Sequence, residues 1–172
     1  MLSGEQAIQL YQLLCEHNIQ VWVSGGWGID ALLGRQTRPH KDLDVIMLLR
    51  DVTGLQALLG RDGFMLKQVW EENLWAAGEH GEQLLTAFVL RDALDREIDA
   101  HALVLDELGF GIPAWDSEGR IFTPDDLSGE GRIGGKVVRC LSAPCQLACH
   151  TGYTLPEAQV RDLQLLQEFI EN

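Results

Sequence analysis

Two nearby segments, Ser24-Gly-Gly-Trp-Gly-Ile-Asp30 and Arg38-Pro-His-Lys-Asp-Leu-Asp44, decide how the fold of this chain of 172 residues is interpreted. The first follows a short apolar run at 20–24, which predicts a strand, and its glycine pair leads into a helical pattern that Gly34 ends. The second leads into an alternating apolar run at 42–48, which predicts another strand. The two segments therefore predict a glycine-rich turn from strand to helix, followed by a strand that begins with two acids.

These two acids, Asp42 and Asp44, are the first candidates for chemistry. Side chains alternate along a strand, so both carboxylates point to the same side while the intervening apolar side chains pack behind them. Adjacent carboxylates repel each other unless a cation lies between them, and Mg²⁺ prefers one or two carboxylates together with phosphate oxygens. At the upstream turn, Gly25 and Gly26 let backbone N–H groups approach a phosphate near a helix N-terminus. The pattern indicates a metal-assisted phosphate site.

A third acid follows in the segment Glu97-Ile-Asp-Ala-His-Ala-Leu103. Asp99 and His101 share one face of this predicted strand, and three carboxylates converge if the strand lies beside the first acidic one. Two Mg²⁺ ions about 3.5–4 Å apart could then assist the transfer of a phosphoryl group. Asp99 is also placed to accept a proton from an attacking hydroxyl. His101 either binds a ligand or forms a hydrogen bond with a neighbouring acid.

The composition narrows the classes of protein and partner. The chain has 13 Lys and Arg against 26 Asp and Glu, a net charge of −13, and 46% of its residues are apolar. An acidic chain lacks the basic face that a nucleic-acid polymer needs, so the expected partner is a small cationic substrate. No apolar run is long enough for a membrane span, and the start lacks a signal-peptide pattern. The four cysteines make a poor disulfide framework, which predicts reduced thiols in a cytoplasmic protein.

The remaining pattern predicts a mixed α/β (α+β) chain. Helices are expected at 5–17, 27–33, 55–59 and 143–149 and after Pro156, and strand-like runs recur at 84–90, 95–104 and 135–141. The stretch 105–134 is expected to be rich in loops. One domain spanning 1–172 is therefore expected, with a small helical part at about 141–172.

The motifs resemble those of the small lincosamide and aminoglycoside nucleotidyltransferases of the DNA polymerase β-like nucleotidyltransferase superfamily, and are nearer to the lincosamide enzymes. The segments that carry the resemblance are Gly25-Gly-Trp-Gly-Ile-Asp-Ala-Leu-Leu-Gly34, Thr37-Arg-Pro-His-Lys-Asp-Leu-Asp44, Ile98-Asp-Ala-His101, Gly134-Gly-Lys-Val-Val-Arg-Cys140 and His150-Thr-Gly-Tyr153, with Leu155 and Asp162 after them. The resemblance implies a nucleotidyltransferase fold, in which a mixed β-sheet with flanking helices precedes a C-terminal helical part that helps to form an antibiotic cleft.

The resemblance also implies transfer of AMP from ATP to a hydroxyl of a small antibiotic, with Mg²⁺ as the cofactor and a lincosamide as the favoured substrate. It assigns Asp42, Asp44 and Asp99 to metal binding, with Asp99 also a candidate base; Gly25 and Gly26 to the triphosphate; and Arg38 and His40 to phosphate contacts or closure of the site. A homodimer is expected if the cleft closes against a second subunit.

Other interpretations remain open. The acceptor could be an aminoglycoside, or a protein as in toxin–antitoxin nucleotidyltransferases, and the chain could be an inactive nucleotide-binding module. A zinc site is disfavoured because Cys140, Cys145, Cys149 and His150 lack a C-x-x-C spacing, and packing along a helix explains Cys145 and Cys149 better. Further residues with two interpretations each are Asp30 (holding Arg38 or His40 in place), Tyr153 with His150 (cleft or packed turn), and Trp70, Trp75 and Trp115 (stacking on a ligand or core).

Overall fold

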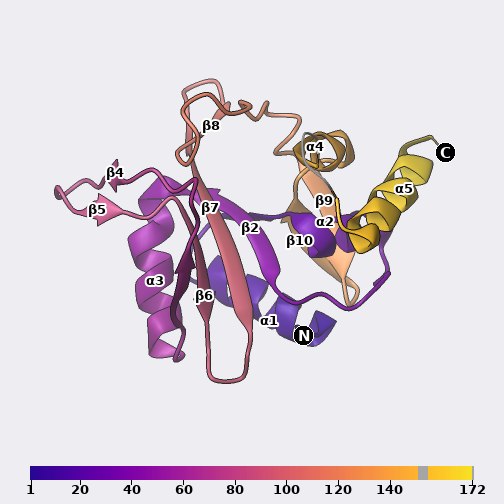
Figure 1. Ribbon diagram of the computed structural model, residues 1–172, viewed down its shortest axis with the longest axis horizontal. Coiled ribbons are helices and arrows are strands. Elements are labelled where there is room, and N and C mark those ends of the chain that lie inside the picture. Colours follow the sequence, from indigo (N-terminus) through magenta and orange to yellow (C-terminus); the bar gives the residue numbers. More distant parts are fainter. Residues whose placement is uncertain (151–154, 172) are drawn as a thin grey trace.

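An eight-stranded mixed sheet forms the centre of the computed structural model, which describes residues 1–150 and 155–171 (Figure 1). Its strands follow the order β3-β6-β7-β2-β1-β10-β9, with β8 paired to β7 off this path. The strands are β1 (Val21–Val23), β2 (Leu43–Leu48), β3 (Met65–Val69), β6 (Ala87–Arg91), β7 (Glu97–Leu105), β8 (Gly111–Pro113), β9 (Gly129–Ile133) and β10 (Lys136–Cys140). A separate small sheet pairs β4 (Ala76–Ala77) with β5 (Gln83–Leu84).

The helices lie around this sheet (Figure 1). They are α1 (Gly4–Glu16), α2 (Gly25–Leu33), α3 (Val52–Arg61), α4 (Ala143–Cys149) and α5 (Glu157–Glu171), and a 3-10 turn, η1 (Leu49–Asp51), precedes α3. Helix α1 begins with a capping box in which Ser3 and Gln6 bind each other's backbone N–H groups. Among the described residues, none of the helices combines the length and apolar character that crossing a membrane requires.

Strand β2 is the element that gives the sheet its two different faces. Leu43, Val45 and Met47 are buried in the main core cluster, together with side chains of α1 and α3. The alternate residues Ile46 and Leu48 belong to a second cluster on the other face, with side chains of β1, β7 and α4. Because side chains alternate along a strand, Asp44 shares the face of this second cluster.

The register of β2 brings the acidic segments together. Strand β2 runs antiparallel to β1 and parallel to β7, and Asp44 pairs with Asp99 across the β2–β7 ladder. Neighbouring strands are about 4.8 Å apart, so the two acids are adjacent. The side-by-side arrangement expected for the two acidic strands is therefore confirmed.

The C-terminal helices α4 and α5 pack against α2 near the β9–β10 end of the sheet (Figure 1). A third apolar cluster joins Ile29 of α2, Ala143 of α4 and Leu166 of α5. An ion pair adds to it: Arg38 donates from Nε and Nη2 to Asp162 Oδ2 over 2.9 and 2.7 Å. The segment between α2 and β2 is thereby tied to the last helix.

The expected mixed sheet with flanking helices is confirmed. The stretch 105–134 is rich in loops, as expected, and also contains the short strands β8 and β9, whereas Met65–Val69 forms a strand that was not expected. All five residues of that strand are exposed, since it lies at the edge of the sheet, so it carries no alternation of buried and exposed residues. The sequence of β9 begins Gly-Glu-Gly-Arg, which likewise lacks the apolar residues that would predict a strand.

Candidate active site

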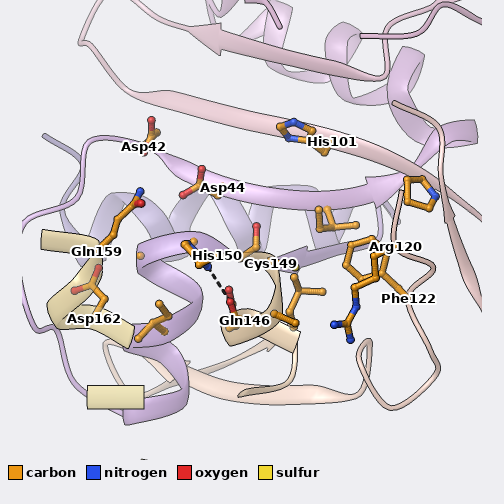
Figure 2. A pocket seen from close by; sticks show the side chains of 18 of the residues that line it. Asp42, Asp44, His101, Arg120, Phe122, Gln146, Cys149, His150, Gln159 and Asp162 are labelled. Carbon is orange, nitrogen blue, oxygen red and sulfur yellow. Dashed lines mark hydrogen bonds between the residues drawn. The ribbon is translucent and has the colours of Figure 1, made fainter. Parts of the chain in front are cut away.

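A cavity of about 780 Å³ opens on the face of β2 that carries Asp44 (Figure 2). Asp42 and Asp44 lie on its β2 side, and α4 lies across from them (Figure 2). Gly25, Gly26, Arg38 and His40 also line the cavity, so six of the residues predicted from the sequence meet in one place: Gly25, Gly26, Arg38, His40, Asp42 and Asp44. Asp99 does not line it, but lies beside Asp44 on β7.

The glycine turn and the acid pair are built against each other. Ser24 N donates to Asp44 O over 2.9 Å, which holds the end of β1 against β2. Gly25 then starts α2 with φ +57°, and a Cβ at this position would collide with the Asp44 carboxylate. At Gly26 a Cβ would collide with the His40 ring. Glycines thus leave the N-terminus of α2 open beside the acids, as the phosphate-site hypothesis requires.

Neighbouring negative charges affect the ionisation of Asp44 and Asp99. Burial raises the pKa of Asp44 well above its usual range, and the negative charges of Asp42 and Asp99 raise it further. Burial is also the largest cause of the raised pKa of Asp99, to which Asp42 and Glu72 add. Because a bound cation would favour the ionised form of both carboxylates, this is donor chemistry that suits Mg²⁺.

The metal would not be held by protein groups alone. Within residues 1–150 and 155–171, no three His, Cys, Asp or Glu side chains gather closely enough to form a metal-binding group. Mg²⁺ commonly uses one or two carboxylates and takes its other ligands from water and substrate phosphates. Asp42 and Asp44, which face the same cavity, fit that coordination.

Asp99 is positioned by two aromatic neighbours. Trp70 donates from Nε1 to Asp99 Oδ1 over 2.9 Å, and His101 Nδ1 lies 3.5 Å from the same oxygen. His101 Nε2 lies 3.3 Å from Glu72 Oε1, and its ring meets Trp115 edge-on with a centroid distance of 5.1 Å. His101 therefore forms the hydrogen bond to a neighbouring acid that was one of its two interpretations. Trp70 orients an acid, a role that its sequence position does not indicate.

Arg38 and His40 line the cavity, but each already has a carboxylate partner. Arg38 is paired with Asp162 of α5. His40 is buried, and its Nε2 lies 2.5 Å from Asp30 Oδ2. Asp30 also accepts hydrogen bonds from Thr37 N and Oγ1, so it holds the segment between α2 and β2 at both Thr37 and His40. The hypothesis that Asp30 holds one of these residues is confirmed for His40.

The other sequence hypotheses have mixed outcomes. Cys145 is buried, but Cys149 is exposed and lines the cavity, so the expectation that both pack in the core is wrong for Cys149, which lies on the open side of α4. Trp115 lines the cavity, whereas Trp75 is exposed. Tyr153 lies outside the described residues.

Further residues that line the cavity were given no role from the sequence, although one of them, Lys41, directly precedes Asp42. Lys41 lines the cavity and lies 3.0 Å from Glu97 Oε2, while Arg120 donates to both oxygens of Asp126. Gln146 and Gln159 also line it, and both carry buried amide atoms without a hydrogen-bond partner among the described residues. The periodicity of their helices gives no signal for such a role.

Comparisons with known proteins identify the family of the chain. The family model described as Aminoglycoside-2''-adenylyltransferase matches residues 6–166. The chain is 25% identical over 155 residues to a lincosamide resistance protein of Staphylococcus haemolyticus, covering 90% of this chain and 88% of that protein. It is 46% identical over 47 residues to a 2''-aminoglycoside nucleotidyltransferase of Klebsiella pneumoniae, covering 26% of this chain and 27% of that protein.

Solved structures share the fold. The lincosamide antibiotic adenylyltransferase LnuA, bound to lincomycin, superposes with a TM-score of 0.78 at 23% identity, covering 96% of this chain and 97% of that one. ANT(2'')-Ia in complex with adenylyl-2''-tobramycin gives a TM-score of 0.67 at 19% identity, covering 97% and 88%.

The family match identifies the chain as a nucleotidyltransferase, and the solved structures share its fold. The resemblance to lincosamide and aminoglycoside nucleotidyltransferases is confirmed by the family match and by the curated relatives. The chain belongs to the aminoglycoside-2''-adenylyltransferase family.

Proposed function

We propose that this chain transfers AMP from ATP to a hydroxyl of a small cationic antibiotic, and that the favoured substrate is a lincosamide. The observation that carries the proposal is the single cavity shared by Asp42, Asp44 and the Gly25–Gly26 turn. Membership of a nucleotidyltransferase family supports the reaction class. The similarity over 155 residues to a lincosamide resistance protein supports the choice of substrate.

Asp42 and Asp44 would hold Mg²⁺, with Asp99 as the third carboxylate beside them. When bound, Mg²⁺ would neutralise charge on the phosphates and favour the departure of pyrophosphate. Burial and the neighbouring charges disfavour the ionised form of Asp44, and a bound Mg²⁺ would stabilise that form, so these residues fit the ion. The open N-terminus of α2 at Gly25 and Gly26 would receive the phosphate oxygens.

Asp99 is proposed as the base. The acceptor hydroxyl oxygen would form a bond to the α-phosphorus, its proton would pass to Asp99, and the bond to the β-phosphate would break with its electron pair leaving on pyrophosphate. Trp70 holds one oxygen of Asp99, so the other oxygen can take the proton. The raised pKa of Asp99, caused first by burial, makes its carboxylate a stronger base than an exposed one.

The cavity has an acidic part and an apolar part in its lining, and each could bind a different part of the acceptor. Glu72 and Asp116 add negative charge, which attracts an amine. Ile46, Pro113 and Phe122 form an apolar wall instead. A lincosamide combines an amine on an apolar ring with a hydroxylated sugar, so it can use both walls. An aminoglycoside carries several ammonium groups and little apolar surface, and would leave the apolar wall unused.

The test is a mass-spectrometric panel with purified protein, Mg²⁺, ATP and one drug in each tube: lincomycin, clindamycin, kanamycin, tobramycin or streptomycin. We expect lincomycin or clindamycin to gain one AMP. Asp42→Asn should abolish this gain while the matched exposed change Asp62→Asn on the surface should not. Unmodified drugs throughout the panel would contradict antibiotic modification, and turnover by Asp42→Asn would contradict the metal assignment.

An aminoglycoside is the second candidate acceptor. It is favoured by the family model over residues 6–166 and by the 46% identity over 47 residues to an aminoglycoside enzyme. The same panel decides between the two candidates. Modification of kanamycin or tobramycin with lincosamides unchanged would support the second candidate and reject the first.

A further inference from the structure

Gln146 on α4 is an unusual side chain because it is fully buried and both of its amide atoms, Nε2 and Oε1, lack a hydrogen-bond partner among the described residues. Buried polar groups in folded proteins are nearly always hydrogen-bonded, and leaving one unpaired destabilises the fold. Gln146 lines the candidate active site (Figure 2). A group of this kind facing a cavity indicates a ligand that supplies both missing hydrogen bonds.

The fold holds this residue firmly in place. Its backbone N–H donates to Ser142 O over 2.9 Å, and its carbonyl oxygen lies 2.8 Å from His150 Nδ1. Gly28 of α2 makes room for the amide, because a Cβ at this position would collide with Gln146 Nε2. The amide therefore lies against the first turns of α2, the helix whose N-terminus is the proposed phosphate site.

The cavity that Gln146 lines also has apolar walls, which suit a flat ring. Ile29 and Leu141 are buried apolar residues that line the same cavity, and Phe122 lies farther along it (Figure 2). A primary amide offers N–H donors beside a carbonyl acceptor, and it can rotate by half a turn to exchange them. Its matching partner is a ring edge with one donor next to one acceptor. The amino group and adjacent ring nitrogen of adenine form such an edge, and glutamine pairs with it through two hydrogen bonds.

We propose that Gln146 binds the adenine ring of the nucleotide, through the amino group and an adjacent ring nitrogen. The inference rests on the proposed function, since it takes ATP as the nucleotide. It adds a base-binding residue on α4, on the other side of the cavity from Asp42 and Asp44 (Figure 2). Gln146 would hold the base while the Gly25–Gly26 turn receives the phosphates.

The experiment measures nucleotide affinity by calorimetry in the presence of Mg²⁺ and without any acceptor drug. Two nucleotides are compared: ATP, and purine riboside triphosphate, which lacks the amino group. The wild-type protein should bind ATP about 10-fold more tightly, a ratio that corresponds to about 1.4 kcal/mol. In Gln146→Leu this preference should disappear, while Gln167→Leu, the same change at an exposed position of α5, should preserve it.

The outcomes separate this proposal from the proposed function. Equal affinities of the wild-type protein for the two nucleotides would overturn the role of Gln146 without needing any variant. An unchanged preference for ATP in Gln146→Leu would also overturn it. A wild-type protein that binds no nucleotide would instead reject both proposals.

Discussion

Replacing Gly25 with alanine tests the contact on which the candidate site is built. Gly25 has φ +57° and leaves no space for a side chain, because a Cβ would collide with the Asp44 carboxylate. Gly34, at the other end of the same helix, has φ +69° but open space around its Cβ position. Both changes force alanine into the left-handed region, and only Gly25→Ala also disturbs Asp44.

The two variants should therefore differ in a way that can be calculated. Left-handed backbone costs alanine about 1–2 kcal/mol, and for a chain of this size each kcal/mol lowers the Tm by about 2–4 °C. Gly34→Ala should lose about that much and keep its turnover. Gly25→Ala should lose a further ~1 kcal/mol or more from the collision. Its turnover should fall about 100-fold, because a displacement of about 1 Å at a reacting group has that effect.

Thermal denaturation and AMP transfer, measured on both variants, provide the assay. Wild-type turnover in Gly25→Ala would show that Asp44 does not need its position against α2. Equal losses of turnover in the two variants would also contradict this need, since left-handed strain alone would explain them.

Three further predictions concern charge. In EDTA at neutral pH and low salt, Asp44→Asn should raise the free energy of unfolding by up to about 3 kcal/mol, because it removes the repulsion between two charges at the strand spacing. The exposed control Asp62→Asn should leave the free energy of unfolding unchanged. A destabilised Asp44→Asn variant would contradict the repulsion between these acids. Arg38→Met should lower the free energy of unfolding by about 2 kcal/mol and speed hydrogen exchange in α5, because Asp162 stays buried without its partner. Unchanged hydrogen exchange would show that the ion pair does not hold the helix. Burial raises the pKa of Asp126, but hydrogen bonds from Thr123 and Arg120 outweigh burial and leave this pKa lowered. The ionised Asp126 side chain therefore stabilises the fold above the usual carboxyl pKa, and this stabilisation is lost as the pH falls. Asp126→Asn should accordingly be less stable than wild type by about 1–2 kcal/mol at pH 7 and equal to it near pH 2; a constant difference would contradict this.

The central part of the fold could be predicted from the sequence because its signals are local. Residues 43–48 are apolar except for Asp44, because one face of β2 is buried under α1 and α3 and the other in the second cluster. The glycines around α2 mark its ends. Edge strand β3 gives no such signal, because all five of its residues are exposed.

The candidate site was predicted as far as neighbouring residues define it. Asp42, Asp44 and the glycine pair belong to segments joined by one short connection, and Asp99 follows from an assumed strand pairing that the register confirms. Gln146 and Asp162 could not be found in this way. Their place in the cavity depends on how α4 and α5 pack against α2, which is a tertiary arrangement without a local pattern.

The most direct test of the central claim is a crystal structure of the protein with Mn²⁺ and a non-hydrolysable ATP analogue, read by anomalous scattering. We expect an anomalous peak in contact with the carboxylates of Asp42 and Asp44, and phosphate oxygens at the N-terminus of α2 beside Gly25 and Gly26. A metal bound away from these two acids, or phosphates bound elsewhere in the cavity, would contradict the claim.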